Sequence, residues 1–215
     1  MAVLAYCITD AEAQIDVPKQ GLQGKKIEGI VESGLRCYIS NYTADDPASK
    51  QPVREAALAF NRILQTFLRQ TAIIPLRYPT VLADANEVSS FLRDHAGEYR
   101  DGLSRIRDGV QMEIRLSSPA WSGSGVENSG AQYLRARQAH YRRVNQIAEE
   151  LYKAVGLAAK SHKIRQVAEG ARCFFLVDRA AVDQFVGNVR SAKLPADVGV
   201  RVSGPWPATE FLKED

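Results

Sequence analysis

Short apolar runs and alternating apolar and polar positions fill the first forty residues, a pattern typical of β-strands. Residues 2–8 (AVLAYCI) form one apolar run and predict a first strand. Residues 26–32 and 35–41 predict two more strands. Ser33-Gly34 lies between them and predicts the turn of a hairpin. The N-terminal region is therefore expected to contain an antiparallel sheet.

The period becomes helical after a polar linker at 43–52. Apolar residues recur every three or four positions from Val53 to Phe67, which predicts a core helix over about 52–70. Pro52 suits the first turn of that helix.

The stretch that follows, 72–82, contains Pro75 and Pro79. Proline cannot donate to a strand ladder, so we expect a short edge strand that leads into a structured loop. A second helical stretch should follow, capped at its start by Asp84 or Asn86, extending to about 107 and broken near Gly97.

The second half of the chain alternates strand and helix patterns in the order β-α-β-β-α-β, the ferredoxin-like order, with its helices on one face of an antiparallel sheet. The first helix is long, with Leu134 and Tyr141 on its inner stripe, and a tight turn is expected at Glu169-Gly170. The elements and the Gly/Ser-rich loop fall at 110–117 (strand), 119–130 (loop), 134–160 (helix), 163–170 and 171–178 (strands), 181–193 (helix) and 198–204 (strand).

The predicted fold class is therefore α+β with two α+β domains. We place the N-terminal domain at 1–108 and a ferredoxin-like domain, with a tryptophan-containing tail, at 109–215.

Composition points to a cytosolic globular protein. Hydrophobic residues make up 45% and charged residues 25% of the 215, and the formal net charge is +3. No apolar run approaches the ~20 residues that span a bilayer, and the first residues lack a basic leader, so we expect a cytoplasmic protein without membrane insertion. Cys7, Cys37 and Cys173 each lie in an apolar run, which favours small buried side chains over a disulfide or a zinc site.

Candidate chemistry is sparse. None of the three histidines has a partner at metal-ligand spacing, no nucleophile motif occurs, and the glycines of 122–125 lack the lysine of a phosphate loop. We therefore expect no enzyme, no cofactor and no metal. The basic segment 135–143 leaves two interpretations open: the solvated back of an amphipathic helix, or a contact with RNA or an acidic protein.

Two charges and the tail stand out. Arg77 and Glu113 each lie inside an apolar, strand-like stretch, and we hypothesise that they pair with each other, the alternative being that both face solvent. In the tail, Gly204, Pro205, Trp206 and Phe211 form either a plug over the core or an exposed anchor for a partner.

An ordered set of motifs extends along nearly the whole chain. It resembles the gas vesicle GvpL/GvpF family through LAYCITDA, IIPLRYPTVLAD, VQMEIRL, GAQYLRAR, FFLVDR and GPWPATEF. The family positions that match here are Pro75, Leu76, Arg77, Tyr78, Thr80, Glu113, Gly130, Tyr133, Leu134, Gly204, Pro205, Trp206, Pro207 and Phe211. Pro79 departs from the usual glycine, and Ala208-Thr209-Glu210 replaces a proline-tyrosine pair.

The resemblance implies a non-catalytic role in building gas vesicles, by contacts with a small apolar shell protein and with other accessory proteins. As interaction candidates we single out Pro75, Leu76, Arg77, Tyr78, Glu113, Gly204, Pro205, Trp206 and Phe211. Two other hypotheses stay open: a ferredoxin-like regulatory module that binds a small molecule, and RNA binding through 135–143.

Overall fold

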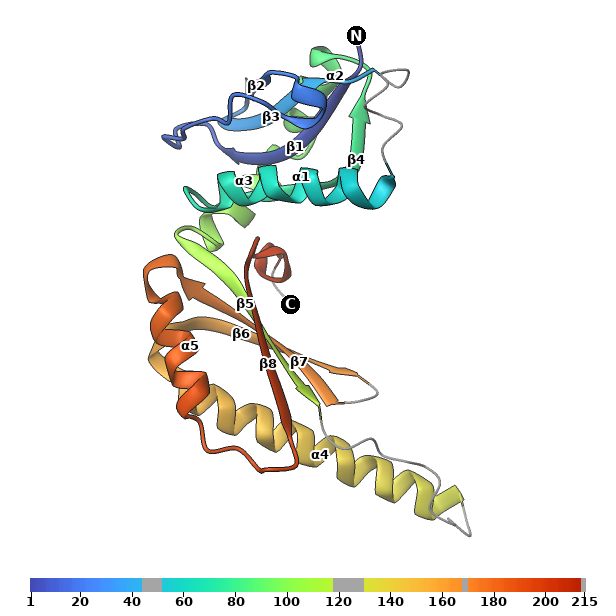
Figure 1. Ribbon diagram of the computed structural model, residues 1–215, viewed down its shortest axis with the longest axis vertical. Coiled ribbons are helices and arrows are strands. Elements are labelled where there is room, and N and C mark those ends of the chain that lie inside the picture. The colour runs from blue at the N-terminus through green and yellow to red at the C-terminus, as the bar shows by residue number, and fades with distance from the viewer. Residues whose placement is uncertain (44–51, 118–129, 168–169, 214–215) are drawn as a thin grey trace. The chain divides into compact units, whose positions relative to one another are not determined.

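The computed structural model describes residues 1–43, 52–117, 130–167 and 170–213, which fall into two compact units (Figure 1). The first unit contains residues 1–108 and the segment that begins at Trp206, and the second is Gly109–Pro205. The division expected from sequence had placed that last segment with the second domain. Most of the expected polar linker, the Gly/Ser-rich loop at 119–129 and the turn residue Glu169 lie outside the described residues.

A four-stranded antiparallel sheet forms the centre of the first unit, in the order β2-β3-β1-β4. The hairpin between β2 and β3 is confirmed. Its turn residues Ser33 and Gly34 have φ angles of 53° and 77°, and a tight two-residue hairpin of this kind needs positive φ at both. The elements are β1 (Val3–Asp10), η1 (Leu22–Gly24), β2 (Ile27–Glu32), β3 (Leu35–Asn41), α1 (Val53–Leu68), β4 (Ile74–Leu82), α2 (Ala85–Asp94), α3 (Ala96–Arg105) and η5 (Thr209–Phe211).

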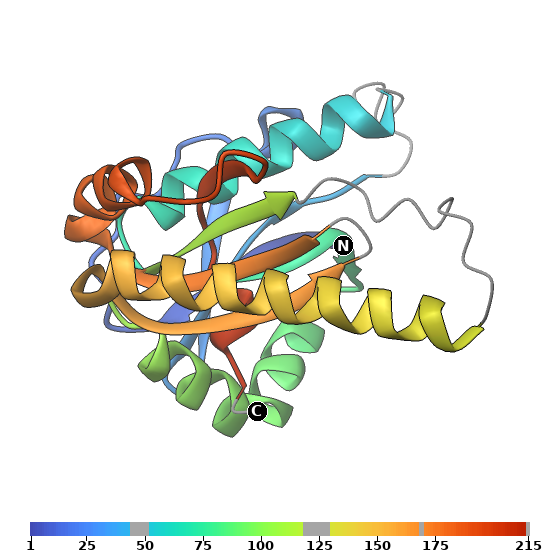
Figure 2. The ribbon, with the colours of Figure 1, turned by 90° about the horizontal axis from the view of Figure 1, so that it is seen from below.

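Helices cover both faces of this sheet. Seven consecutive residues of β1, from Val3 to Thr9, are buried, which requires cover on both sides because side chains alternate along a strand. Helix α1 lies on one face, and α2 and α3 lie on the other (Figure 2). The expected helical break falls at His95, whose ring nitrogen Nδ1 lies 2.9 Å from the carbonyl oxygen of Phe91.

The second unit has the ferredoxin-like order that the sequence predicts. Its sheet is ordered β6-β7-β5-β8. One core cluster joins residues of α4 and α5 to Met112, Ile114 and Leu116 of β5, so both helices lie on the same face. The elements are β5 (Gly109–Ser117), α4 (Gly130–Val155), η3 (Gly156–Ala158), β6 (Ala159–Val167), β7 (Gly170–Asp178), η4 (Arg179–Ala181), α5 (Val182–Ser191) and β8 (Gly199–Trp206).

Candidate functional site

Strand β4 carries the first group of candidate residues and lies at an edge of its sheet, as expected, although its nine residues make it longer than predicted. Its pairing with β1 is interrupted: Ala5 faces Thr80 and Cys7 faces Pro75. Residues 76–79 of β4 therefore bulge opposite Tyr6 alone. A bulge at a sheet edge redirects side chains and ends regular pairing.

The bulge is fastened to the interior by aromatic rings. The ring of Tyr78 lies 5.2 Å from that of Phe60 on α1, and Phe60 lies 5.2 Å from Tyr6 on β1. The hydroxyl of Tyr6 bonds Ser40 Oγ at 2.7 Å and accepts the backbone N–H of Leu22 at 2.9 Å. Burial raises the pKa of both Tyr6 and Tyr78, so these hydroxyls stay neutral. These ring contacts and hydrogen bonds hold the bulge in a defined shape.

The outer side of the bulge is polar. Arg77 is exposed, and its backbone carbonyl accepts a 2.6 Å hydrogen bond from Thr80 Oγ1, which closes the bulge locally. Val81, two positions after Pro79, is 41% exposed. An arginine, a rigid turn and an apolar side chain are thus presented together on β4, whose outer edge pairs with no other strand of the described residues.

The two aromatic residues of the C-terminal segment differ in exposure. Trp206 is 38% exposed, whereas Phe211 in η5 is buried. The segment is held against α3: Arg105 donates to the Leu212 carbonyl at 2.7 Å. Lys213 also pairs with Glu98 at 2.9 Å. These contacts explain why the segment belongs to the first unit, and they favour the plug at Phe211 and the exposed position at Trp206.

Glu113 has a partner that the sequence did not indicate. Both of its carboxylate oxygens accept hydrogen bonds from Arg172 on β7, at 2.7 and 3.0 Å. The hypothesis that Glu113 pairs with Arg77 is therefore wrong. The reason is register: Glu113 faces Phe174 across the ladder, so Arg172 lies diagonally next to it on the same face of the sheet.

The described residues show no cluster of metal-ligating side chains and no activated thiol. All three cysteines are buried and free. Burial raises the pKa of the thiols of Cys37 and Cys173 to about 12 and that of Cys7 well above its ordinary value, so none is a ready thiolate. Within the described part of the chain, no three His, Cys, Asp or Glu side chains gather where a metal could bind. No helix in that part is long and apolar enough to cross a bilayer.

Helix α4 differs from its prediction in its first half. Its buried residues begin only at Val144, and Leu134, expected on the inner stripe, is 62% exposed. The first half of the helix extends beyond the ends of the strands (Figure 1). A helix of 26 residues is about 39 Å long. The nine-residue strands beneath it span about 30 Å. This difference in length between helix and strands is the feature that could have predicted an unburied first half of α4.

Comparison with known proteins places these features in a family. Residues 2–213 match the family described as "Gas vesicle synthesis protein GvpL/GvpF". The chain belongs to the GvpL/GvpF family. Gas vesicle protein L of Streptomyces sp. (strain CB03234) is 24% identical over 183 residues, which are 73% of this chain and 68% of that protein.

Two crystal structures share the fold. GvpF from Microcystis aeruginosa superposes with a TM-score of 0.79 at 12% identity, over 99% of each chain. GvpF from Anabaena sp. PCC7120 gives a TM-score of 0.78 at 13% identity, over 100% of this chain and 97% of the other. The GvpL/GvpF resemblance and the fold class drawn from the sequence are thus confirmed.

Proposed function

We propose that this GvpL/GvpF protein is an accessory factor of gas vesicle assembly that acts in the cytoplasm and on the growing vesicle. In this proposal it acts by contacts with the shell protein and with other accessory proteins. The observation that carries it is the outer edge of β4, which pairs with no strand in the described part of the chain. There the bulge at 76–79 presents Arg77, while Tyr78 fastens the segment to the interior.

The physical argument starts from the shell subunit. A small apolar subunit self-associates through exposed apolar surface unless a partner covers that surface first. A free strand edge provides such cover by strand addition: backbone hydrogen bonds supply affinity and alternate side chains supply selectivity. Pro75 and Pro79 lack N–H groups, which limits indiscriminate pairing along β4. We assign the selective contacts to Arg77 and Val81.

A matched pair of variants tests the edge. Val81→Lys places a charge on β4, and Val31→Lys places the same charge on β2, the opposite edge of the same sheet. Both valines are exposed, at 41% and 54%, so neither change removes core packing. In co-purification with the shell protein, we expect Val81→Lys and Arg77→Ala to lower capture about tenfold. Val31→Lys should leave capture near the wild-type level.

The same variants decide the role in cells. Deletion of the gene should abolish vesicles, and wild-type and Val31→Lys chains should restore them. Val81→Lys should restore few or none. Normal vesicle yield after deletion would refute the accessory role itself. Full rescue by Val81→Lys would refute only the assignment to β4.

A groove in the second unit favours the small-molecule alternative. It has a volume of about 740 Å³ and lies between α5 and β8, with Val186, Val198 and Val202 among its lining residues. Arg190 and Arg201 also line it. A regulatory ligand would be apolar and anionic, and a rise in melting temperature with such a compound would support that function.

A further inference from the structure

No strand of the described residues lies beneath the first half of α4. Among residues 130–143 none is buried, whereas Val144, Ile147 and Leu151 further along are. A helical segment of about 14 residues is marginal in water when no surface packs against it. Within the described residues, the face that packs the core after Val144 therefore continues past the sheet at 130–143.

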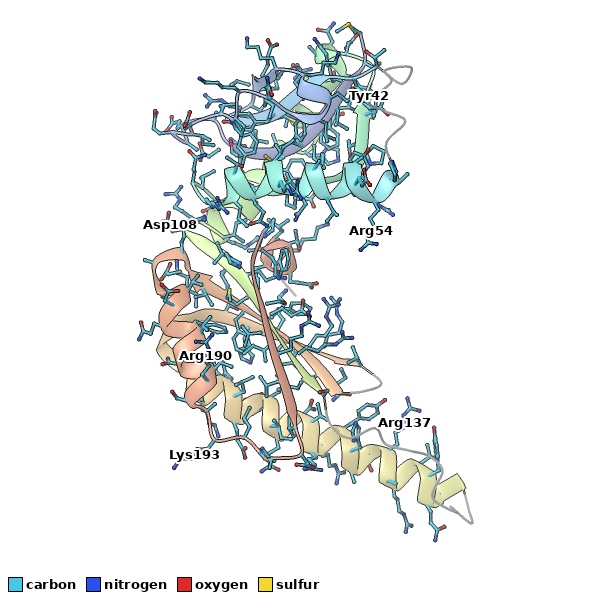
Figure 3. The ribbon with its side chains drawn as sticks, viewed as in Figure 1. Tyr42, Arg54, Asp108, Arg137, Arg190 and Lys193 are labelled. Carbon is cyan, nitrogen blue, oxygen red and sulfur yellow. The ribbon has the colours of Figure 1, made fainter. Side chains whose placement is uncertain are left out.

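The side chains on that continuing face form an ordered ladder. Tyr133, Arg137 and Tyr141 are spaced by four residues and so share one side of the helix. The Arg137 guanidinium donates from Nε and Nη2 to the Tyr141 hydroxyl, both at 3.2 Å, and lies 5.4 Å from the ring centre. Tyr133 lies about one helical turn before Arg137 on the same side of the helix. Figure 3 shows Arg137 on this projecting half.

The charged side chains of this segment are all positive. From Gly130 to Ala148 the sequence contains four arginines and no aspartate or glutamate. Arg143 pairs with Asp197 at 2.5 Å, and the others are exposed. The exposed Leu134 lies beside the ladder, so the face combines an aliphatic side chain, two tyrosines and a positive field.

From this combination we propose that the face formed by Tyr133, Leu134, Arg137 and Tyr141 binds an acidic amphipathic helix of another protein. The partner's apolar stripe would pack on Leu134 and the tyrosines, in the place that the sheet occupies further along α4. Its carboxylates would meet Arg137. A second copy of this chain is disfavoured, because pairing would bring two arginine-rich helices together.

Nucleic acid fits this face less well. Stacking with bases requires available aromatic rings, and the ring of Tyr141 already lies against Arg137. A phosphate backbone also makes no use of the exposed Leu134. The docking site is independent of the β4 edge, so Val81→Lys should leave it intact.

Two arginines on opposite sides of the helix make the test specific. At 100° per residue, Arg142 lies about 140° around the helix from Arg137. The full-length chain is titrated against a labelled acidic peptide of about 20 residues, with leucine at the a and d heptad positions and glutamate elsewhere. Fluorescence anisotropy reports binding. A scrambled peptide of the same composition and a single-stranded RNA of about 20 nucleotides are the comparison probes.

We expect Arg137→Glu to weaken binding at least about tenfold and Arg142→Glu by less than about threefold. Leu134→Ala should weaken it roughly tenfold as well. Circular dichroism melts confirm that each variant folds, because all three side chains are exposed. Increasing salt should weaken binding without abolishing it.

Four results would overturn the assignment. The first is no binding of the helical peptide at low salt. The second is an equal loss in Arg137→Glu and Arg142→Glu, which would mean attraction without a defined face. The third is binding of the scrambled peptide or the RNA as tight as that of the helical peptide. The fourth is a dimer, seen by sedimentation, that dissociates in Leu134→Ala and so assigns the face to a second copy.

Discussion

Removing the carboxylate of Glu113 should destabilise the second unit by about 1–2 kcal/mol. In the native protein, Arg172 donates two parallel hydrogen bonds to this carboxylate, at 2.7 and 3.0 Å. Exposed ion pairs are worth about 0.2–1 kcal/mol, and breaking a buried one costs about 3–5 kcal/mol. The two side chains are 17% and 37% exposed, so solvent weakens the interaction without removing it.

The change to test is Glu113→Gln, which keeps the shape of the side chain and removes its charge. The guanidinium of Arg172 also lies 5.0 Å from the centre of the Phe174 ring, and this contact survives the substitution. Urea unfolding of the wild type, Glu113→Gln, Arg172→Gln and the double variant gives the coupling energy directly. We expect about 1 kcal/mol of coupling, and a melting temperature lower by about 4–8 °C per kcal/mol for a unit of this size.

The pH dependence provides a second, independent readout. The hydrogen bonds from Arg172 hold the pKa of Glu113 below its usual value. The stabilisation is therefore fully present above the unfolded-state pKa of about 4.3, and it disappears as pH falls through the lower folded-state pKa. The stability difference between wild type and Glu113→Gln should be constant above about pH 5.5 and shrink towards zero in acid.

Two outcomes would refute this reasoning. One is a coupling energy below about 0.3 kcal/mol, and the other is a stability difference that persists unchanged in strong acid. Either would mean that Arg172 does not hold Glu113 in solution. Glu113 would then be available to contact a partner protein.

Three further changes probe the scaffold around these surfaces. Gly170→Ala should cost more than about 3 kcal/mol, because φ is 147° there and a Cβ would lie 2.0 Å from the carbonyl oxygen of Leu116; a large drop in melting temperature checks this. Asp84→Ala should cost about 1 kcal/mol in urea unfolding, since its carboxylate accepts the N–H groups of Asn86 and Glu87 at the start of α2. Phe211→Ala should cost about 3 kcal/mol and expose the C-terminal segment to limited proteolysis, because the ring is buried.

Where local period and turn chemistry agree, the prediction from sequence succeeded. The hairpin at Ser33-Gly34 and the β-α-β-β-α-β order both follow from spacings of two, three or four residues. The inner stripe of α4 failed at Leu134 for a physical reason. Helical period identifies one face of a helix, but it contains no information on how far the surface beneath that face extends.

The candidate residues divide in the same way. Sequence identified Arg77, Glu113 and Trp206 as unusual for their surroundings, and the family resemblance connected them with gas vesicles. The residues that contact them in the fold could not be predicted from the sequence. Arg172 is 59 residues from Glu113 in the chain, and strand register alone brings the two together.

By itself, the sequence determined the order of strands and helices, the tight turn at Ser33-Gly34 and which family the chain resembles, because these depend on short-range periodicity and ordered motifs. The tertiary structure decided the rest. Among the described residues, it pairs β4 with β1 alone, packs the C-terminal segment against α3, and places no strand beneath the first half of α4. Those outcomes depend on which distant segments pack together and on how the lengths of the packed elements compare, and neither is encoded in local periodicity.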